Sequence, residues 1–84
     1  MPHANHVERY PGTLAELATE LGDLRYDALA TFLEELAAKL EADSLADGAR
    51  GRGKLAAALR AASDEVTSAA EHIAKAWRIC EPHM

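Results

Sequence analysis

Hydrophobic residues recur at three- and four-residue spacing in three consecutive segments, and this periodicity predicts amphipathic helices. The first stripe consists of Leu14, Leu17, Ala18 and Leu21. Thr13 with Glu16 three residues later forms a capping box, so we expect a helix to begin at Thr13. Gly22 interrupts the stripe, which makes this helix short.

The second stripe predicts a longer helix from Leu24 to about Leu45. Its spaced leucines are Leu29, Leu33, Leu36 and Leu40. Three glycines then lie within six residues, and glycine is poorly suited to a helix interior because it loses the most backbone freedom on folding. The helix should therefore end in a turn between residues 47 and 53.

The third segment carries the strictest repeat in the sequence, with alternating steps of four and three residues. The positions are Leu55, Leu59, Ala62, Val66, Ala69, Ile73, Ala76 and Cys80. A 3.5-residue period over more than three heptads predicts a seam for close antiparallel packing against the leucines of the second helix. A helix of about 27 residues would be roughly 40 Å long. We expect the short first helix to lie over the end of this hairpin that remains exposed.

The predicted fold is all-α, with a short N-terminal helix, a long antiparallel helical hairpin and pairing into a dimeric helical bundle. Residues 1–12 contain prolines, glycine and histidines without apolar periodicity and form an irregular arm, while residues 13–84 form a single helical domain. A chain of 84 residues has room for only one core.

Core material is scarce, and this scarcity is the reason to expect a homodimer. Hydrophobic residues make up 49% of the sequence, but 19 of them are alanines, which lose little surface on burial. A single small core seldom supplies enough stability without disulfides, metals, very regular packing or a partner subunit. Apolar residues away from the seam, namely Phe32, Trp77 and Ile79, are the candidate interface. The alternative is a compact monomeric three-helix bundle.

Charge and cysteine content bear on which molecules the protein binds and on its cellular compartment. Fourteen acidic against nine basic residues give a net charge of −5, which disfavours non-specific binding to nucleic acid and to anionic lipid. Charged residues recur every few positions, so no apolar run approaches the roughly 20 residues that a membrane span needs. One cysteine and no export-signal pattern lead us to expect a cytoplasmic protein.

The basic, glycine-rich turn at residues 49–54 is the first candidate site. Arg50, Arg52 and Lys54 lie here, Arg60 follows on the next helix, and no acid occurs between residues 48 and 60. Backbone amides at a helix start together with arginine side chains suit an anion or a nucleic-acid phosphate. The turn lacks the spacing of a phosphate-binding P-loop. The competing interpretation is that nearby acids neutralise these bases.

A metal site is the second candidate, because thiolate and imidazole bind zinc or copper. Cys80 and His83, three residues apart, could offer two donors, with His72 as a further weak candidate and His3 and His6 in the arm. The competing interpretation is a buried structural cysteine with surface histidines. The sequence therefore predicts no cofactor with any specificity.

Catalytic chemistry finds little support, since adjacent acids such as Glu34 and Glu35 point about 100° apart on a helix and cannot face one substrate together. No nucleophile, base and acid arrangement can be read from the spacing. We expect a small non-enzymatic helical interaction or oligomerisation protein that pairs with itself and offers a surface to another protein. The anion-binding and metal-binding modules are the alternatives.

Overall fold

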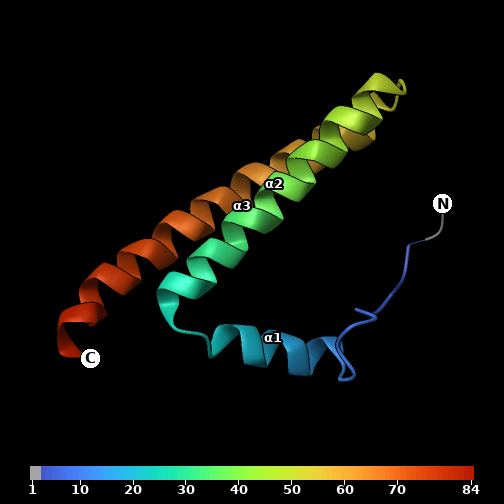
Figure 1. Ribbon diagram of the computed structural model, residues 1–84. Coiled ribbons are helices and arrows are strands. Elements are labelled where there is room, and N and C mark those ends of the chain that lie inside the picture. The colour runs from blue at the N-terminus through green and yellow to red at the C-terminus, as the bar shows by residue number, and fades with distance from the viewer. Residues whose placement is uncertain (1–2) are drawn as a thin grey trace.

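The computed structural model describes residues 3–84, and every regular element in that range is helical. Helix α1 spans Leu14–Gly22, α2 spans Tyr26–Ala49, α3 spans Gly53–Cys80, and a 3₁₀ turn, η1, covers Glu81–His83 (Figure 1). Residues 3–12 contain no regular element, and residues 1–2 of the predicted arm lie outside the described range. No helix in the described chain is both long and apolar enough to span a bilayer.

Helix α1 begins at the predicted capping box. The Thr13 hydroxyl oxygen accepts a hydrogen bond from the Glu16 backbone N–H at 3.1 Å. The Glu16 carboxylate in turn accepts from the Thr13 N–H at 2.9 Å. Two amides that the helix leaves without partners are thereby satisfied, and the capping hydrogen bonds lower the pKa of Glu16.

The turn between α2 and α3 follows from one glycine with a positive φ. Gly51 has φ of 78°, which a residue with a Cβ rarely adopts. The N–H of Gly51 donates to the Gly48 carbonyl, and the N–H of Arg52 donates to the Asp47 carbonyl. This Schellman motif terminates α2 four residues beyond the expected Leu45, so Gly48 lies within the helix.

Helices α2 and α3 form the antiparallel hairpin (Figure 1), and the residues buried between them are small. The buried residues of the two helices are Ala30, Ala37, Ser44, Ser63 and Ala70. The Ser63 hydroxyl donates to the Ala37 carbonyl at 2.8 Å, and the Ser44 hydroxyl donates to the Ala56 carbonyl at 2.7 Å. These two hydrogen bonds from side chain to facing backbone fix the register of the hairpin.

The predicted seam of α3 is half correct. Leu59, Val66, Ile73 and Cys80 lie half-buried at the contact. The second set of seam positions is Ala56, Ser63 and Ala70, each one residue after the predicted position, while Leu55 remains 45% exposed and Ala69 is exposed. The structure favours the smaller side chains because they let the backbones approach until serine reaches the opposite carbonyl.

The expectation that the first helix covers the exposed end of the hairpin is wrong. Helix α1 diverges from α2 after Gly22 and does not pack closely on α2 or α3 (Figure 1). None of its residues is buried, and Leu14 is 58% exposed. The three residues Asp23–Arg25 change the chain direction between α1 and α2, and the hairpin is therefore the only closely packed pair of long helices in residues 3–84.

The close approach of α2 and α3 predicts that Ala37→Leu destabilises the protein by about 1 to 3 kcal/mol, because added methylenes must force the helices apart. Ala37 is 4% exposed and accepts the Ser63 hydrogen bond through its carbonyl. Urea unfolding at one fixed protein concentration measures the change. Ala38→Leu, on the exposed side of the same helix turn, is the control and should change the free energy of unfolding little. Equal effects of the two substitutions would contradict the close contact.

Candidate functional site

The hairpin has one apolar flank, formed by the residues that directly precede the small seam residues. On α2 these are Leu29 and Leu36, with Phe32 between them. On α3 they are Ala62 and Ala69, and Ala76, which precedes Trp77, continues the row by one heptad. In an antiparallel pair of helices, residues that precede the seam residues of either helix lie on the same side of the pair. Asp43 and Leu55 confirm this: they precede Ser44 and Ala56, and both line one hollow. We call these six residues the leucine–alanine face.

The opposite flank of the hairpin is polar. It includes Glu34 and Glu41 on α2 with Arg60 and Thr67 on α3, each four positions after a small seam residue, and Asp27 lies one heptad before Glu34. Glu41 and Arg60 approach to 3.9 Å across the two helices, which confirms that these positions share a side. The hairpin is therefore asymmetric, with mainly charged and polar residues on one flank and mainly apolar residues, apart from Asp43 near the closed end, where α2 turns into α3, on the other.

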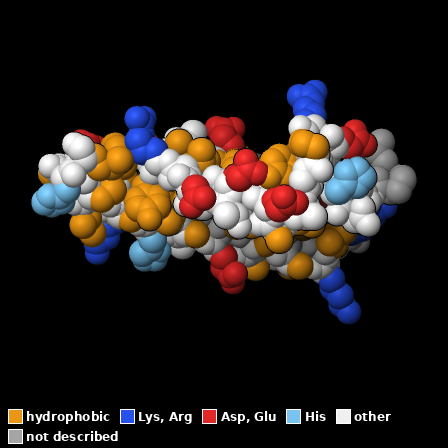
Figure 2. Space-filling model, turned by 90° about the horizontal axis from the view of Figure 1, so that it is seen from below, with side chains coloured by type: hydrophobic (Ala, Val, Ile, Leu, Met, Phe, Trp, Pro, Cys, Tyr) orange, Lys and Arg blue, Asp and Glu red, His pale blue; other side chains and the backbone are white. Residues whose placement is uncertain are grey.

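Large apolar side chains lie on the leucine–alanine face and along its border with the seam. The half-buried members are Leu29, Leu33, Leu40, Leu59, Val66 and Ile73. Phe32 and Leu36 are 38% and 37% exposed, and in the described chain no large side chain is fully buried. Hydrophobic side chains also reach the surface in groups along the molecule, around a cluster of acidic ones (Figure 2). The fully enclosed part of the hairpin thus consists only of alanine and serine.

The three predicted interface residues are divided between this face and the open end of the hairpin, where α2 begins and α3 ends. Phe32 belongs to the leucine–alanine face, and Ile79, 65% exposed, follows one turn after Ala76. Trp77 is half-buried at the open end. The heptad pattern of the sequence predicts Ala62, Ala69 and Ala76 in the seam, but they lie on the leucine–alanine face. The seam is formed by the heptad positions one residue later, including Ser63 and Ala70.

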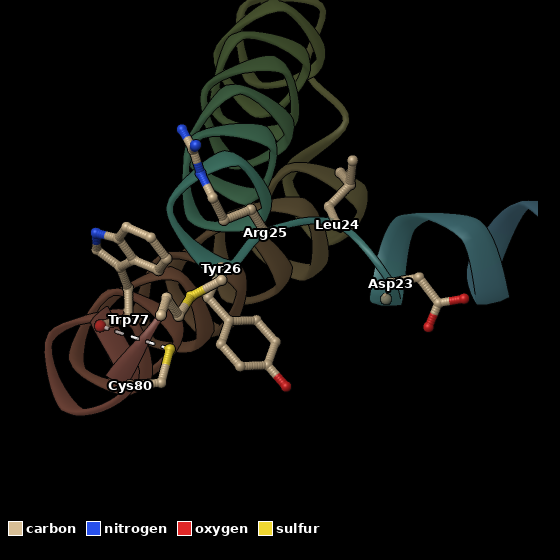
Figure 3. A pocket seen from close by; sticks show the side chains of 8 residues that line it. Asp23, Leu24, Arg25, Tyr26, Trp77 and Cys80 are labelled. Atoms are coloured by element: carbon tan, nitrogen blue, oxygen red, sulfur yellow. Dashed lines mark hydrogen bonds between the residues drawn. The ribbon is translucent and has the colours of Figure 1, made fainter. Parts of the chain in front are cut away.

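The open end also contains a cation–aromatic contact that sequence reasoning missed. The Arg25 guanidinium lies 5.4 Å from the centre of the Trp77 ring and is held by Asp27 through hydrogen bonds of 2.6 and 2.9 Å. A hollow of about 290 Å³ lies beside it. Figure 3 shows the Cys80 thiol beside the Trp77 carbonyl, while the Tyr26 ring and the Asp23 carboxylate point away from Trp77. Two charged neighbours and an aromatic ring thus close this end of the hairpin.

The arginine and aspartate of this contact perturb each other. The Arg25 hydrogen bonds lower the pKa of Asp27, and the same bonds raise the pKa of Arg25. Because the pKa of Asp27 is lower in the folded state, the pair stabilises the fold at pH values above the ordinary aspartate pKa. This contribution is lost as the pH falls through the lowered pKa of Asp27 in the folded protein. Arg25 and Asp27 are solvent-facing, so the effect is local.

The basic turn is accompanied by acidic side chains. Asp47, whose side chain is 13% exposed, lies 3.2 Å from Arg52 and 4.0 Å from Arg50. Arg60 faces Glu41, as described above, and Lys54 is exposed in the first turn of α3. Three of the four predicted anion-binding side chains therefore point toward a carboxylate of this chain. This arrangement favours the interpretation that the charges of the turn compensate one another.

The cysteine and histidines are not gathered at one point. The Cys80 thiol is half-buried and lies 3.7 Å from the Trp77 carbonyl. The His72 ring nitrogen lies 2.9 Å from the Ser68 carbonyl on its own helix, while His83 is exposed in η1. Among residues 3–84, no three histidine, cysteine, aspartate or glutamate side chains form a group suited to a metal ion.

Comparison with protein-family models, with curated proteins and with solved structures gives no match for this chain. The features of this chain that bear on its function are the leucine–alanine face and the two ends of the hairpin.

The Arg25–Asp27 pair predicts an acid transition in the fluorescence of Trp77, the single tryptophan of the sequence. Protonation of Asp27 releases Arg25, so we expect an emission change with a midpoint below the ordinary aspartate pKa of about 3.9. Asp27→Asn should remove this transition and resemble the acid form at neutral pH. Glu16→Gln, a control on α1, should leave it unchanged. A midpoint above the ordinary value would contradict the assignment.

Proposed function

We propose that this chain is a small, non-enzymatic interaction protein that works as a homodimer, in which two hairpins pack through their leucine–alanine faces. The observation that carries the proposal is the burial of only alanine and serine within one copy. Leucine, valine, isoleucine and phenylalanine side chains supply most of the hydrophobic free energy of a core, about 1.5 to 3 kcal/mol each when fully buried. In a single copy these side chains obtain only part of that stabilisation.

The surface area of the chain supports association. A compact protein of 9.0 kDa should expose about 4,900 Å², whereas this chain exposes 6537 Å². Its radius of gyration is 15.2 Å, against about 12 Å for a compact domain of this length. The excess of roughly 1,700 Å² lies within the range of about 1,000 to 2,500 Å² per chain that obligate homodimers bury.

Side-chain size supports a second copy as the occupant of the face. On α2 the face carries large residues, Leu29, Phe32 and Leu36, and on α3 it carries alanines. A symmetric pair can place the large residues of one copy over the alanines of the other, and the reverse, so that both volumes are filled. The result is a bundle of four long helices with the half-buried residues of both hairpins at its centre.

The polar flank would then remain in water, where Asp27, Glu34 and Glu41 provide the solubility that a dimer needs and offer a surface to a further protein partner. We propose the cytoplasm as the setting, because one half-buried cysteine suits a reducing compartment. The anion-binding and metal-binding alternatives have weaker support, since Asp47 and Glu41 neutralise the arginines and the histidines lie apart.

Solution mass tests the dimer directly. Light scattering and sedimentation at micromolar concentration should give about 18 kDa, twice the 9.0 kDa of one chain. Leu36→Glu should weaken the dimer by about 3 kcal/mol, or roughly 100-fold in the dissociation constant, because it places a carboxylate of each copy in the apolar interface.

Leu45→Glu is the matched control for this experiment. Leu45 lies on the same helix and is 60% exposed, but it is outside the leucine–alanine face. It should leave the dissociation constant unchanged. A wild-type mass of 9.0 kDa across the concentration range, or equal weakening by both substitutions, would overturn the proposed dimer.

A further inference from the structure

The N-terminal segment, residues 3–22, runs along one side of the hairpin (Figure 1). At the closed end, where α2 turns into α3, His3 lines a hollow of about 630 Å³ together with Asp43 and Leu55. Asp43 and Leu55 continue the two rows of the leucine–alanine face by one heptad. The segment therefore begins on the flank through which the proposed dimer would form.

The same segment finishes at the opposite end of the hairpin. Gly22 and Leu24 line the hollow of about 290 Å³ at the open end together with Trp77. Leu24 and Asp43 are 19 residues apart on the sequence, or about 28 Å along the helix at 1.5 Å per residue. The large residues of the face, Leu29–Leu36, lie between these two levels. The segment thus extends over the full length of these large residues.

A bend in the arm returns the chain from α1 toward the closed end. The Tyr10 N–H donates to the Val7 carbonyl at 3.0 Å. The Tyr10 ring lies so close to Gly12 that a Cβ at this glycine would be 2.6 Å from it. The capping box at Thr13 follows directly. Because bend, cap and helix are each ordered by local contacts, we call residues 3–22 the N-terminal strap.

The N-terminal strap leaves too little room for a second hairpin at the closed end. A helix with its side chains is about 10 Å across, so ten residues of one helix occupy about 1,200 Å³. The hollow between His3 and the hairpin has about half that volume, and a second hairpin would bring two helices. A second copy can therefore reach the whole face only after the N-terminal strap has moved away.

We propose that the N-terminal strap regulates the dimer by blocking the leucine–alanine face until it is displaced. This inference rests on the proposed homodimer and adds the conformational step that controls it. Displacement breaks few contacts, because α1 does not pack closely on α2 or α3. Both copies must open before they pair, so the apparent dissociation constant of the dimer rises with the inverse square of the open fraction.

A covalent tether that holds the N-terminal strap closed tests this regulation. The full-length chain carries His3→Cys and Ala46→Cys, two positions that line the same hollow, and Cys80→Ala removes the native thiol. A short bismaleimide, added at high dilution, joins the two thiols within one chain. Sedimentation should then give a dissociation constant about 100-fold larger, since a tenfold smaller open fraction in each copy has this effect.

Two matched controls accompany the tethered chain. The same variant treated with N-ethylmaleimide carries both modified thiols without a tether, and it provides the reference dissociation constant. The second control replaces Ala46→Cys with Ala57→Cys. Ala57 is exposed and follows Leu55 by two residues, so it lies about 200° around α3 from the hollow. Its bridge to position 3 should form with at least about tenfold lower yield.

The outcomes separate the regulation from the dimer itself. Absence of a bridge between positions 3 and 46, or equal yields at positions 46 and 57, would overturn the closed position. Equal dissociation constants for the tethered and the capped chains would overturn the blocking. A capped chain that stays at 9.0 kDa, like the wild type, would reject the homodimer and the regulation with it. A tethered monomer beside a dimeric capped chain supports both.

Discussion

The structure depends on how closely the backbones of α2 and α3 approach each other. Ala30, Ala37 and Ser44 of one helix meet small residues of the other, and hydroxyl groups of Ser63 and Ser44 bond directly to the facing carbonyls. Such contacts are possible only where side chains near the axis are small. A larger residue at any of these positions would remove the hydrogen bonds together with the packing.

This close approach determines the position of the hydrophobic mass. Because the small positions of the seam have no room for leucine, Leu29 and Leu36 lie beside them, and Ile73 and Val66 are only half-buried. Both helices displace their apolar residues to the same flank, since an antiparallel pair places equivalent heptad positions side by side. The apolar flank is therefore a consequence of the fold, and its association with a second copy would bury the hydrophobic surface that the hairpin leaves in water.

Charged side chains and backbone geometry, instead of buried hydrophobic side chains, order the chain at the two ends of the hairpin. At the closed end, the Gly51 conformation terminates α2, and the Asp47 carboxylate accepts a hydrogen bond from Arg52 and lies 4.0 Å from Arg50. At the open end, Asp27 positions Arg25 over the ring of Trp77. Ion pairs this exposed contribute about 0 to 1 kcal/mol each. They orient the chain locally, and the larger part of the stability must come from packing along the helices.

The sequence by itself determined the helices, the capping box at Thr13 and the glycine turn, because each of these features depends on neighbouring residues. It also predicted a scarcity of core residues and placed Phe32, Trp77 and Ile79 outside the seam, of which Phe32 and Ile79 are exposed and Trp77 is half-buried. It did not determine which alanines form the contact: Ala69 and Ala70 both fit a helical repeat, and only the facing Ala37 carbonyl, which the Ser63 hydroxyl reaches, selects the register. The tertiary structure likewise decided that α1 stands apart from the hairpin, since the direction of a chain through Asp23–Arg25 depends on interactions distant in sequence.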